Sequence, residues 1–480
     1  MQVLSVASEV FPLIKTGGLA DVTGALPAAL RHHGVSMTTL LPGYPAVMQA
    51  LENPAARHTE KNLFGGEAHL LSGKIKGLDV LVLDAPHLFA RPGNPYAGPD
   101  GKDWPDNAQR FAALSRIAGD VALGRAGKQQ VDVLHLHDWQ AALAAAYVRY
   151  ADGIARRPAT VVTVHNIAFQ GTFPSSLFST LGLPPHAYAL DGVEYYGSVS
   201  YLKGGLASAD RITTVSPTYA QEITTPEFGM GLDGLLRERR GVVSGIVNGI
   251  DEDTWNPEND KTLAKTYNAK SLVNRSENKR ALEKRLNLDK GDGIIHGVVS
   301  RLTWQKGLDL LTEHLDWLVG TGARLVLVGT GEAAIEGAFK QAAARHKGKI
   351  GVTFTYDEGL SHLIQGGADT MLVPSRFEPC GLTQLYGLRY GCVPIVARTG
   401  GLADTVIDAN VAALSSGVAT GFQFSPINAD TLQTVLTRAH TLYADGNAWS
   451  GLQLRGMAQD VSWKASAAAY ASLYKTLVQQ

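Results

Sequence analysis

Short apolar runs that alternate with longer segments of helical spacing constrain the fold of this 480-residue chain most strongly. Each run is followed within a few residues by Gly, His, Asp or Pro. Apolar runs of this length are typical of parallel strands that are buried beneath helices on both faces. The sequence therefore predicts an α/β fold with doubly wound parallel sheets. The expected strands are 3–7, 80–83, 131–136, 160–164, 294–299, 325–328 and 393–396.

The length and an internal repeat predict two domains. A chain of 480 residues is too long for one core of about 150 residues. Thr16-Gly-Gly-Leu-Ala-Asp21 recurs letter for letter as Thr399-Gly-Gly-Leu-Ala-Asp404, which indicates two similar halves unless the match is coincidence. We expect a boundary in the Gly- and Arg-rich stretch 229–249, where strand and helix signals lapse.

We expect the last helix to begin at about Ser462 and to pack back against one of the domains. Its apolar face is formed by Trp463, Tyr470, Leu473, Tyr474 and Leu477. The expected division is therefore 1–240, 241–457 and a terminal helix in 458–480.

Charge and cysteine content exclude several classes of protein. Lys and Arg number 43 against 44 Asp and Glu, so no net field attracts nucleic acid or an anionic membrane. Cys380 and Cys392 are too few for a disulfide framework or a four-cysteine zinc site. Glu9 and Pro12 interrupt the first apolar stretch, so we do not expect it to act as a signal peptide, and no run of about 18 apolar residues occurs in the sequence. We expect a cytoplasmic protein without nucleic-acid or membrane partners.

Two motifs that follow predicted strands are suited to binding an anion. In the first copy of the repeat, Gly17 and Gly18 precede a helix, whose free N–H groups and dipole favour phosphate, with Lys15 adding charge. When this motif stands alone, a plain strand-to-helix turn is the favoured explanation. In Ser300-Arg-Leu-Thr-Trp-Gln-Lys-Gly307, Arg301 and Lys306 are placed to neutralise a diphosphate, although exposed bases are often only solvated.

The segment 373–391 carries the most chemistry. Its loop places Glu378 where a carboxylate can bind a sugar hydroxyl, and Gly381-Leu-Thr383 begins a helix that can hold phosphate. A single loop glutamate is more often a surface charge. Cys380 has no base nearby in the sequence, so we expect a packing or positioning role for it rather than nucleophilic attack.

Polar residues also follow two strands of the first half, in His135-Leu-His-Asp-Trp139 and Thr163-Val-His-Asn166. The carboxyl ends of parallel strands are where open α/β sheets build their sites. A metal at His135 and His137 is disfavoured because no further ligands cluster nearby. Gly329-Thr-Gly331 is half of a dinucleotide-binding fingerprint and lacks the third glycine.

In combination and order, these motifs resemble the bacterial glycogen synthases and the related starch synthases over almost the whole chain. Further matching motifs are Ser8-Glu9, Val247-Asn-Gly-Ile-Asp251, Trp255-Asn-Pro257 and Pro374-Ser-Arg-Phe-Glu-Pro-Cys-Gly-Leu-Thr-Gln384. The resemblance implies a GT-B fold of two Rossmann-like domains that face each other across a deep cleft, with a C-terminal helix that returns to the first domain. It implies transfer of glucose from ADP-glucose to the non-reducing end of an α-1,4-glucan such as glycogen, with retention and without metal or cofactor. Because Arg301 and Lys306 lie on the second domain and Lys15 on the first, we expect closure of the cleft to assemble the site.

The resemblance also implies roles for individual residues. Catalytic roles fall to Lys15, His165, Arg301, Lys306 and Glu378. Donor binding is expected of Lys15, Gly17, Gly18, Asp138, Asn248, Arg301, Lys306, Tyr356, Glu378, Cys380, Gly381, Leu382 and Thr383, with Tyr356 against the adenine. Glu9, Tyr96 and Trp139 are candidates on the acceptor side. Tyr386 stands where many retaining GT-B enzymes carry a second glutamate, a departure that fits the glycogen synthase branch.

Several alternatives stay open at this point. The diphosphate-binding residues do not distinguish ADP-glucose from UDP-glucose. The sequence also does not predict the oligomeric state or any allosteric control. Retention through a front-face reaction is our hypothesis, because no suitable carboxylate is apparent for a double displacement. Rival functions are a pyridoxal-phosphate-dependent glucan phosphorylase, an NAD-dependent dehydrogenase built on Gly329-Thr-Gly331, and a non-catalytic glucan-binding protein.

Overall fold

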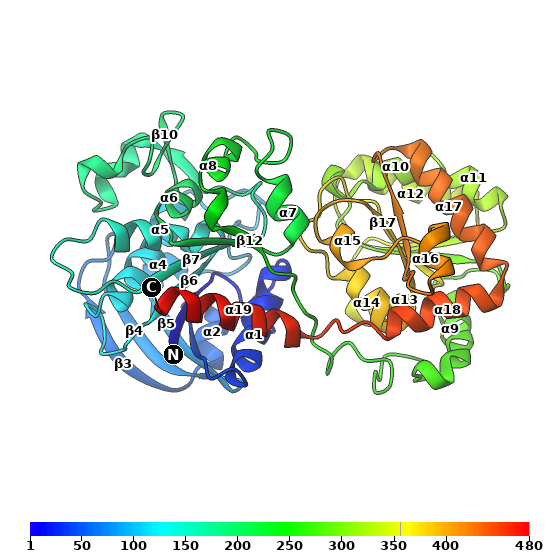
Figure 1. Cartoon of the computed structure of the whole chain (residues 1–480), viewed down its shortest axis with the longest axis horizontal. Coiled ribbons are helices and arrows are strands. Elements are labelled where there is room, and N and C mark those ends of the chain that lie inside the picture. The colour runs from blue at the N-terminus through cyan, green and yellow to red at the C-terminus, as the bar shows by residue number, and fades with distance from the viewer. Residues whose placement is uncertain (356, 480) are drawn as a thin grey trace. The chain divides into compact units, whose positions relative to one another are not determined.

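The computed structural model describes residues 1–355 and 357–479, and its contacts divide the chain into two compact units. Unit 1 comprises Met1–Gly249 and Trp463–Gln480, and unit 2 comprises Ile250–Ser462. In Figure 1, unit 1 runs from the blue N-terminus to green and also contains the red terminal helix. Within the described residues, no helix is long and apolar enough to cross a membrane.

Unit 1 is built on a nine-stranded sheet with the order β12-β11-β7-β6-β1-β2-β5-β4-β3. The strands from β12 to β5 are parallel, and β4 and β3 add an antiparallel edge. The strands are β1 (Gln2–Val6), β2 (Ser36–Pro42), β3 (Glu52–Glu60), β4 (Ala68–Ile75), β5 (Leu78–Asp84), β6 (Val133–His137), β7 (Ala159–Val164), β11 (Arg211–Thr214) and β12 (Val243–Gly245). The first six parallel strands along the chain have the spatial order 3-2-1-4-5-6, which is the Rossmann order.

A small antiparallel sheet and several helices complete unit 1. The small sheet has the order β8-β10-β9 and is formed by β8 (Thr172–Pro174), β9 (Glu194–Tyr195) and β10 (Ser198–Ser200). The α-helices are α1 (Gly18–Arg31), α2 (Pro45–Ala50), α3 (Pro86–Phe89), α4 (Asn107–Ala122), α5 (Asp138–Arg149), α6 (Tyr201–Ser208), α7 (Pro217–Glu222), α8 (Asp233–Glu238) and α19 (Trp463–Val478). Short 3₁₀ helices are η1 (Ser175–Thr180), η2 (Pro185–Ala187) and η3 (Arg240–Val242).

Unit 2 has a six-stranded parallel sheet of the same Rossmann order, β15-β14-β13-β16-β17-β18. Its strands are β13 (Ile295–Val299), β14 (Arg324–Val328), β15 (Ile350–Thr353), β16 (Thr370–Val373), β17 (Val393–Ala397) and β18 (Phe422–Phe424). Its helices are η4 (Ala269–Asn274), α9 (Arg275–Arg285), η5 (Trp304–Lys306), α10 (Leu308–Thr312), α11 (Leu315–Gly320), α12 (Ala333–Arg345), α13 (Glu358–Gly367), α14 (Thr383–Tyr390), α15 (Gly400–Thr405), α16 (Val411–Ser415), α17 (Ala429–Tyr443) and α18 (Gly446–Met457).

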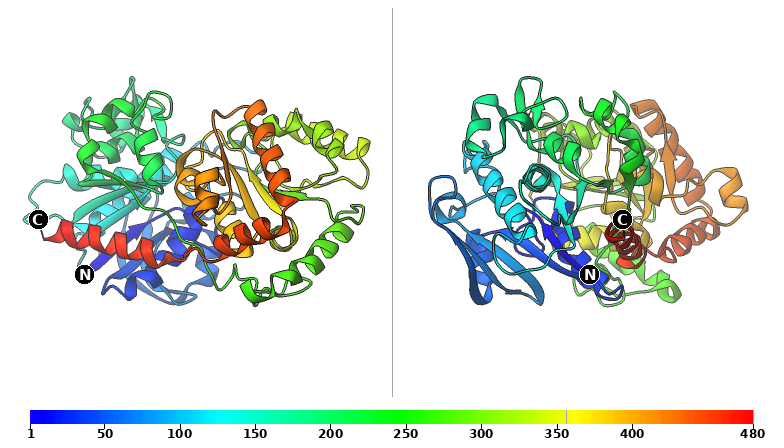
Figure 2. Two further views of the ribbon diagram at one scale, coloured as in Figure 1. Left: turned by 45° about the vertical axis from the view of Figure 1, so that its right-hand side comes forward. Right: turned by 60° about the vertical axis from the view of Figure 1, so that its left-hand side comes forward.

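The terminal helix α19 packs on α1 within unit 1, as both views of Figure 2 show. It buries the rings of Trp463, Tyr470 and Tyr474 in a cluster with residues of α1, β1 and β6. Burial of aromatic and leucine side chains is worth about 1.5–3 kcal/mol for each large side chain. The apolar face that the sequence predicts for this helix is therefore the face that packs.

The seven predicted apolar runs all form strands, which confirms the α/β prediction. The antiparallel edge formed by β3 and β4 differs from the sequence prediction, which was of parallel sheets only. The repeated hexapeptide begins a helix in each unit, at α1 and at α15. The two copies do not occupy equivalent positions, because the first follows β1, the first strand of its sheet, whereas the second follows β17, the fifth.

Candidate active site

The loop between β1 and α1 is held by the buried carboxylate of Glu9. That carboxylate accepts hydrogen bonds from the Thr16 backbone N–H (2.5 Å), from the Thr16 hydroxyl (2.6 Å) and from the Tyr96 hydroxyl. Burial, and then the charge of Glu9, raise the pKa of Tyr96 well above its usual value, so its proton stays available for this bond. Glu9 therefore fixes the backbone that leads into Gly17 and Gly18.

The glycines of this loop are exposed at the start of α1. A Cβ at Gly17 would meet no atom within 4 Å, so the space beside the backbone is open. Lys15, whose side chain is 36% exposed, pairs with Asp21 at 2.7 Å. The beginning of a helix, an open glycine and an adjacent cation together suit a bound anion.

Asp138 stands at the start of α5 in a conformation that non-glycine residues seldom adopt, with φ of 55°. Its Oδ1 accepts the backbone N–H of His165 at 2.7 Å, which joins the ends of β6 and β7. Desolvation by burial raises the pKa of Asp138 to about 7, although the backbone N–H groups of His165 and Asn166 act in the opposite direction. The structure thus brings Asp138 and His165 together at the carboxyl edge of the sheet.

The histidines of β6 hydrogen-bond to neighbouring side chains. His137 Nδ1 lies 3.0 Å from His165 Nε2, and His135 Nε2 lies 2.6 Å from the Thr163 hydroxyl. The other ring nitrogen of His135 lies 2.7 Å from the hydroxyl of Tyr474 on α19. Within residues 1–355 and 357–479, no three His, Cys, Asp or Glu side chains are grouped as metal ligands.

In unit 2, Lys306 and Glu378 form a nearly buried ion pair, although 71 residues separate them in the sequence. Lys306 Nζ lies 2.6 Å from Glu378 Oε2, and the Ser375 hydroxyl donates to the same oxygen at 2.8 Å. The pair meets because the loops after β13 and β16, which are neighbours in the sheet, run side by side. The hydrogen bond from Ser375 partly offsets the desolvation of this pair.

Arg376 ties these two loops together. Its guanidinium donates to both carboxylate oxygens of Asp309, at 2.7 and 2.6 Å, and to the backbone carbonyl of Trp304 at 2.7 Å. It also lies 4.6 Å from the centre of the Trp304 ring. Arg301 is exposed, and its side chain makes no hydrogen bond or ion pair with the described residues. Arg301 is therefore available to a ligand.

The loop between Glu378 and α14 is packed from behind by the second hexapeptide. A Cβ on Gly400, whose φ is 43°, would lie 2.0 Å from the backbone oxygen of Glu378, and one on Gly401 would lie 2.2 Å from that of Cys380. The thiol of Cys380 is buried and is not in a disulfide. Gly381, Leu382 and Thr383 are partly exposed at the start of α14.

The other predicted site residues differ in their surroundings. Asn248 is buried, and its Oδ1 has no hydrogen-bond partner in the described part of the chain. Trp139 packs among aromatic rings, with its ring 4.9 Å from that of Phe111. Tyr356, the residue expected against adenine, lies outside the described residues.

Two sequence features have packing explanations. The ring of Tyr386, at the position of the second glutamate of many GT-B enzymes, is stacked at 3.7 Å on Trp255. Gly329 and Gly331, the half fingerprint, lie where a Cβ would meet the backbone oxygens of Ser300 and Leu302 at 1.8 and 2.1 Å. These two glycines therefore allow the segment that follows β14 to pass close to the loop that carries Arg301.

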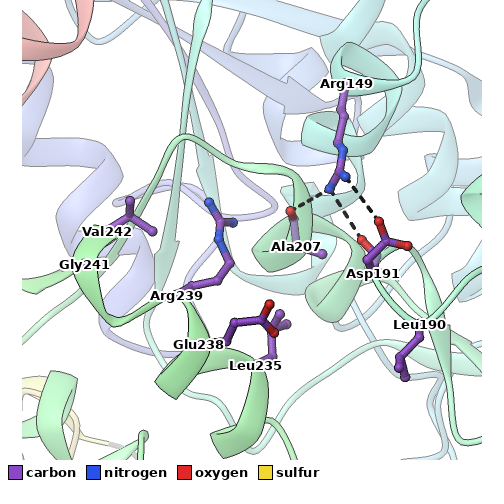
Figure 3. A pocket seen from close by; sticks show the side chains of 9 residues that line it. All are labelled: Arg149, Leu190, Asp191, Ala207, Leu235, Glu238, Arg239, Gly241 and Val242. Carbon is purple, nitrogen blue, oxygen red and sulfur yellow. Dashed lines mark hydrogen bonds and ion pairs between the residues drawn. The ribbon is translucent and has the colours of Figure 1, made fainter.

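A separate pocket of about 640 Å³ lies at the other end of α5 from Asp138 (Figure 3). Its two arginines donate hydrogen bonds to backbone carbonyls at the end of α6. Arg149 donates to the Ala207 carbonyl at 2.8 Å, and Arg239 donates to the Ala209 carbonyl at 2.6 Å. Arg149 also pairs with Asp191 at 3.5 Å. None of the predicted site residues lines this pocket.

Comparison with known proteins gives a consistent result over the whole chain. The family model described as "Starch synthase catalytic domain" matches residues 2–238, and the one described as "Glycosyl transferases group 1" matches residues 278–442. A glycogen synthase of Rhodopseudomonas palustris (strain BisA53) is 58% identical over 479 residues, which cover 100% of this chain and 98% of that protein. A glycogen synthase of Novosphingobium aromaticivorans is 58% identical over 481 residues, with coverage of 100% and 99%.

Solved structures agree with this result. The catalytic domain of starch synthase IV from Arabidopsis thaliana, bound to ADP and acarbose, matches with a TM-score of 0.89 and 33% identity, over 100% of this chain and 99% of that one. A sucrose-phosphate synthase from Thermosynechococcus elongatus, with a TM-score of 0.59 and 15% identity, shares the fold. The dehydrogenase alternative is therefore wrong. This chain has the GT-B fold and belongs to the glycogen and starch synthase family of glycosyltransferases.

Proposed function

We propose that the chain transfers glucose from ADP-glucose to the non-reducing end of an α-1,4-glucan, with retention of configuration, in glycogen synthesis. The observation that carries this proposal is the Lys306–Glu378 pair, which lies between the exposed Arg301 loop and the start of α14. Cations and a helix start suit a diphosphate, and a carboxylate suits sugar hydroxyls. The printed names of the relatives and the ADP bound by the plant starch synthase support the choice of donor and acceptor.

Unit 2 would stabilise the negative charge of the leaving ADP. Negative charge develops on ADP as the bond to glucose breaks, and Arg301, Lys306 and the N–H groups at Thr383 are the groups that would stabilise it. Lys306 has three N–H donors and uses one on Glu378, so others remain for phosphate oxygens. Gly381, Leu382 and Cys380 would form the backbone around the distal phosphate. Tyr356 would contact the adenine.

Unit 1 would supply contacts to the glucose and to the acceptor. Lys15, Gly17 and Gly18 would contact phosphate and sugar, and Asp138, His165 and Asn248 would line the sugar. The unpartnered Oδ1 of buried Asn248 supports this role, because buried polar atoms rarely stay unpaired without a ligand or water. The division of labour assigns the acceptor to residues 1–240 and the donor to 241–457.

Glu9, Tyr96 and Trp139 would act on the acceptor side. Glu9 and Tyr96 hydrogen-bond to each other, and Glu9 also accepts two bonds from Thr16. We propose that they act by holding the loop before α1, while the partly buried Trp139 contacts the glucan. Substitution of Glu9 by Gln should then affect KM for both substrates.

Retention is best explained by a front-face reaction, in which a departing phosphate oxygen accepts the proton of the acceptor hydroxyl. A double displacement needs a carboxylate nucleophile opposite the leaving group. His165, the side chain that we place near the reacting carbon, is not a carboxylate. Mass spectrometry of enzyme quenched with a slow donor should show no glucosyl adduct, and a covalent adduct on Asp138 or Glu378 would contradict the front-face route.

The direct test of the function offers labelled ADP-glucose and UDP-glucose separately with glycogen. We expect label in glycogen from ADP-glucose, α-1,4 linkages in the product, and full activity after dialysis against EDTA. Lys306→Ala is the control for catalysis by this site. Release of glucose 1-phosphate from glycogen and phosphate would instead indicate a phosphorylase, and glycogen binding without turnover would indicate a binding protein.

A further inference from the structure

Ser5, His137 and His165 form a hydrogen-bonded chain across three adjacent strands of unit 1. Ser5 lies on β1, His137 ends β6, and His165 follows β7, in the sheet order β7-β6-β1. The Ser5 hydroxyl lies 3.1 Å from His137 Nε2, and His137 Nδ1 lies 3.0 Å from His165 Nε2. Ser5 and His137 are buried, and His165 is partly exposed at the edge of the sheet.

Both imidazoles are neutral at physiological pH. Burial lowers the pKa of His165 to about 3 and lowers that of His137 well below its usual value. A neutral imidazole carries one N–H and one bare nitrogen, which can only accept. The chain therefore contains three hydrogens for two contacts: one on Ser5, one on His137 and one on His165.

In the first arrangement, His165 donates from Nε2 to His137 Nδ1. The hydrogen of His137 must then stand on Nε2 and point at the oxygen of Ser5. The hydroxyl hydrogen of Ser5 has no other acceptor in the described residues, and Ser5 is 1% exposed. This arrangement buries an unpaired donor, which is costly.

In the second arrangement, Ser5 donates to His137 Nε2, and His137 donates from Nδ1 to His165 Nε2. The hydrogen of His165 then stands on Nδ1, which has no partner in residues 1–355 and 357–479 and belongs to a partly exposed side chain. No buried hydrogen is left unpaired. We infer that Ser5 and His137 are positioning residues, which hold His165 in the tautomer that carries its proton on Nδ1.

This inference gives His165 a defined chemistry and rests on the proposed function for its substrate. A nitrogen that already carries a proton donates a hydrogen bond and cannot act as a base. His165 would therefore donate to an oxygen of the bound sugar nucleotide. The main-chain bond from His165 to Asp138, at 2.7 Å, holds the same residue from its backbone side.

The tautomer is measured directly by long-range ¹H–¹⁵N correlation spectra of protein labelled with ¹⁵N-histidine, in which His165→Gln assigns the signals. We expect the proton of His165 on Nδ1 in the wild type and a mixture of tautomers in Ser5→Ala. A proton on Nε2 of His165 in the wild type would overturn the inference. This measurement needs no turnover, so it is independent of whether the proposed reaction is correct.

Kinetics of two His137 variants test the role in catalysis. His137→Asn keeps a donor near Nδ1, whereas His137→Phe keeps the ring and removes the donor. We expect kcat to fall about 10- to 100-fold in His137→Phe, with KM changed less than about threefold, and to recover in His137→Asn. Equal kcat in the two variants would contradict the inference.

A second buried histidine pair provides the matched control. His296 and His440 of unit 2 lie with their Nε2 atoms 2.8 Å apart, and neither belongs to the proposed site. His440→Phe should lower the melting temperature without changing kcat, which would show that loss of a buried histidine pair does not by itself impair catalysis. Should His137→Phe fail to fold, the tautomer of the wild type still decides the question.

Discussion

The two identical hexapeptides, 16–21 and 399–404, each begin a helix and yet have opposite surroundings. A Cβ on Gly17 would stand in open space. A Cβ on Gly400 or Gly401 would collide with backbone oxygens of the loop that carries Glu378 and Cys380. The backbone of the first copy is therefore accessible to a ligand, whereas the backbone of the second copy packs against another loop of the same unit.

The position of a motif in the topology therefore decides what the motif contacts. The first copy follows the first strand of its sheet, and its topological counterpart in unit 2 is the loop after β13, with Arg301 and Lys306. The loops after the fourth parallel strand of each unit, β6 and β16, correspond in the same way, and they carry Asp138 and Glu378. Equivalent strand ends thus supply the candidate site of each unit, although their sequences differ.

The largest expected effect is at the second hexapeptide. Gly400→Ala places a methyl group 2.0 Å from the Glu378 carbonyl at a backbone angle that disfavours alanine, so the loop must move. We expect the melting temperature to fall by more than about 5 °C and transfer activity to be nearly lost. Calorimetry and the glycogen assay measure both. Wild-type stability and activity in this variant would show that the packing is not required.

The next effect contrasts two lysines. Lys306→Ala leaves the nearly buried carboxylate of Glu378 with only Ser375 and removes a cation from the diphosphate, so we expect kcat to fall about 100- to 1,000-fold. Lys15→Ala breaks a more exposed pair, worth at most about 1 kcal/mol of stability. It should lower activity without lowering the melting temperature. A stability loss in Lys15→Ala as large as that in Lys306→Ala would undermine the comparison.

A smaller effect is expected where Arg376 joins the two loops of unit 2. Arg376→Ala removes a two-pronged bond to Asp309 and the contact with Trp304, so the Arg301 loop loses its support. We expect KM for the donor to rise about 3- to 10-fold, and Arg376→Lys not to restore it, because lysine cannot make the planar fork. Initial-rate kinetics decide this, and full rescue by lysine would mean that charge alone suffices.

The last prediction concerns the pH dependence of stability at Asp138. Its pKa is about 7 in the folded protein and about 3.9 unfolded, so the folded state holds a proton that the unfolded state loses in this interval. The free energy of unfolding therefore falls as pH rises from about 4 to about 7 because of this group. Asp138→Asn should remove that fall, so that urea unfolding shows a stability gain at pH 8 relative to pH 5. An equal difference from wild type at both pH values would contradict the assignment.

Much of the fold could be predicted from the sequence, because buried parallel strands are continuous apolar runs that differ clearly from their surroundings. The edge strand β3 was not predictable in this way, since Glu52–Glu60 is mostly polar and exposed. The short strands β11, β12 and β18 also lack a long apolar run. Their place is decided by neighbouring strands rather than by local sequence.

The sequence predicts which loops form the candidate site, but it does not predict which side chains in those loops contact one another. Glycines and bases after strands mark the loops that hold Lys15, Lys306 and Glu378. The contacts between loops depend on strand order, which one sequence does not reveal. The bond between Glu9 and Tyr96, 87 residues apart, has no sequence signal. His137 could be noticed in the sequence, but its role depends on the neighbouring strands that carry Ser5 and His165.

The central claim is that the first hexapeptide contacts ligand and the second contacts protein. It is tested most directly by the melting temperature of Gly17→Ala with and without saturating ADP-glucose. The variant should melt within about 2 °C of the wild type when free, and ADP-glucose should raise its melting temperature less than it raises that of the wild type. A clear loss of stability in the free variant, with the full ligand-induced rise retained, would contradict the claim.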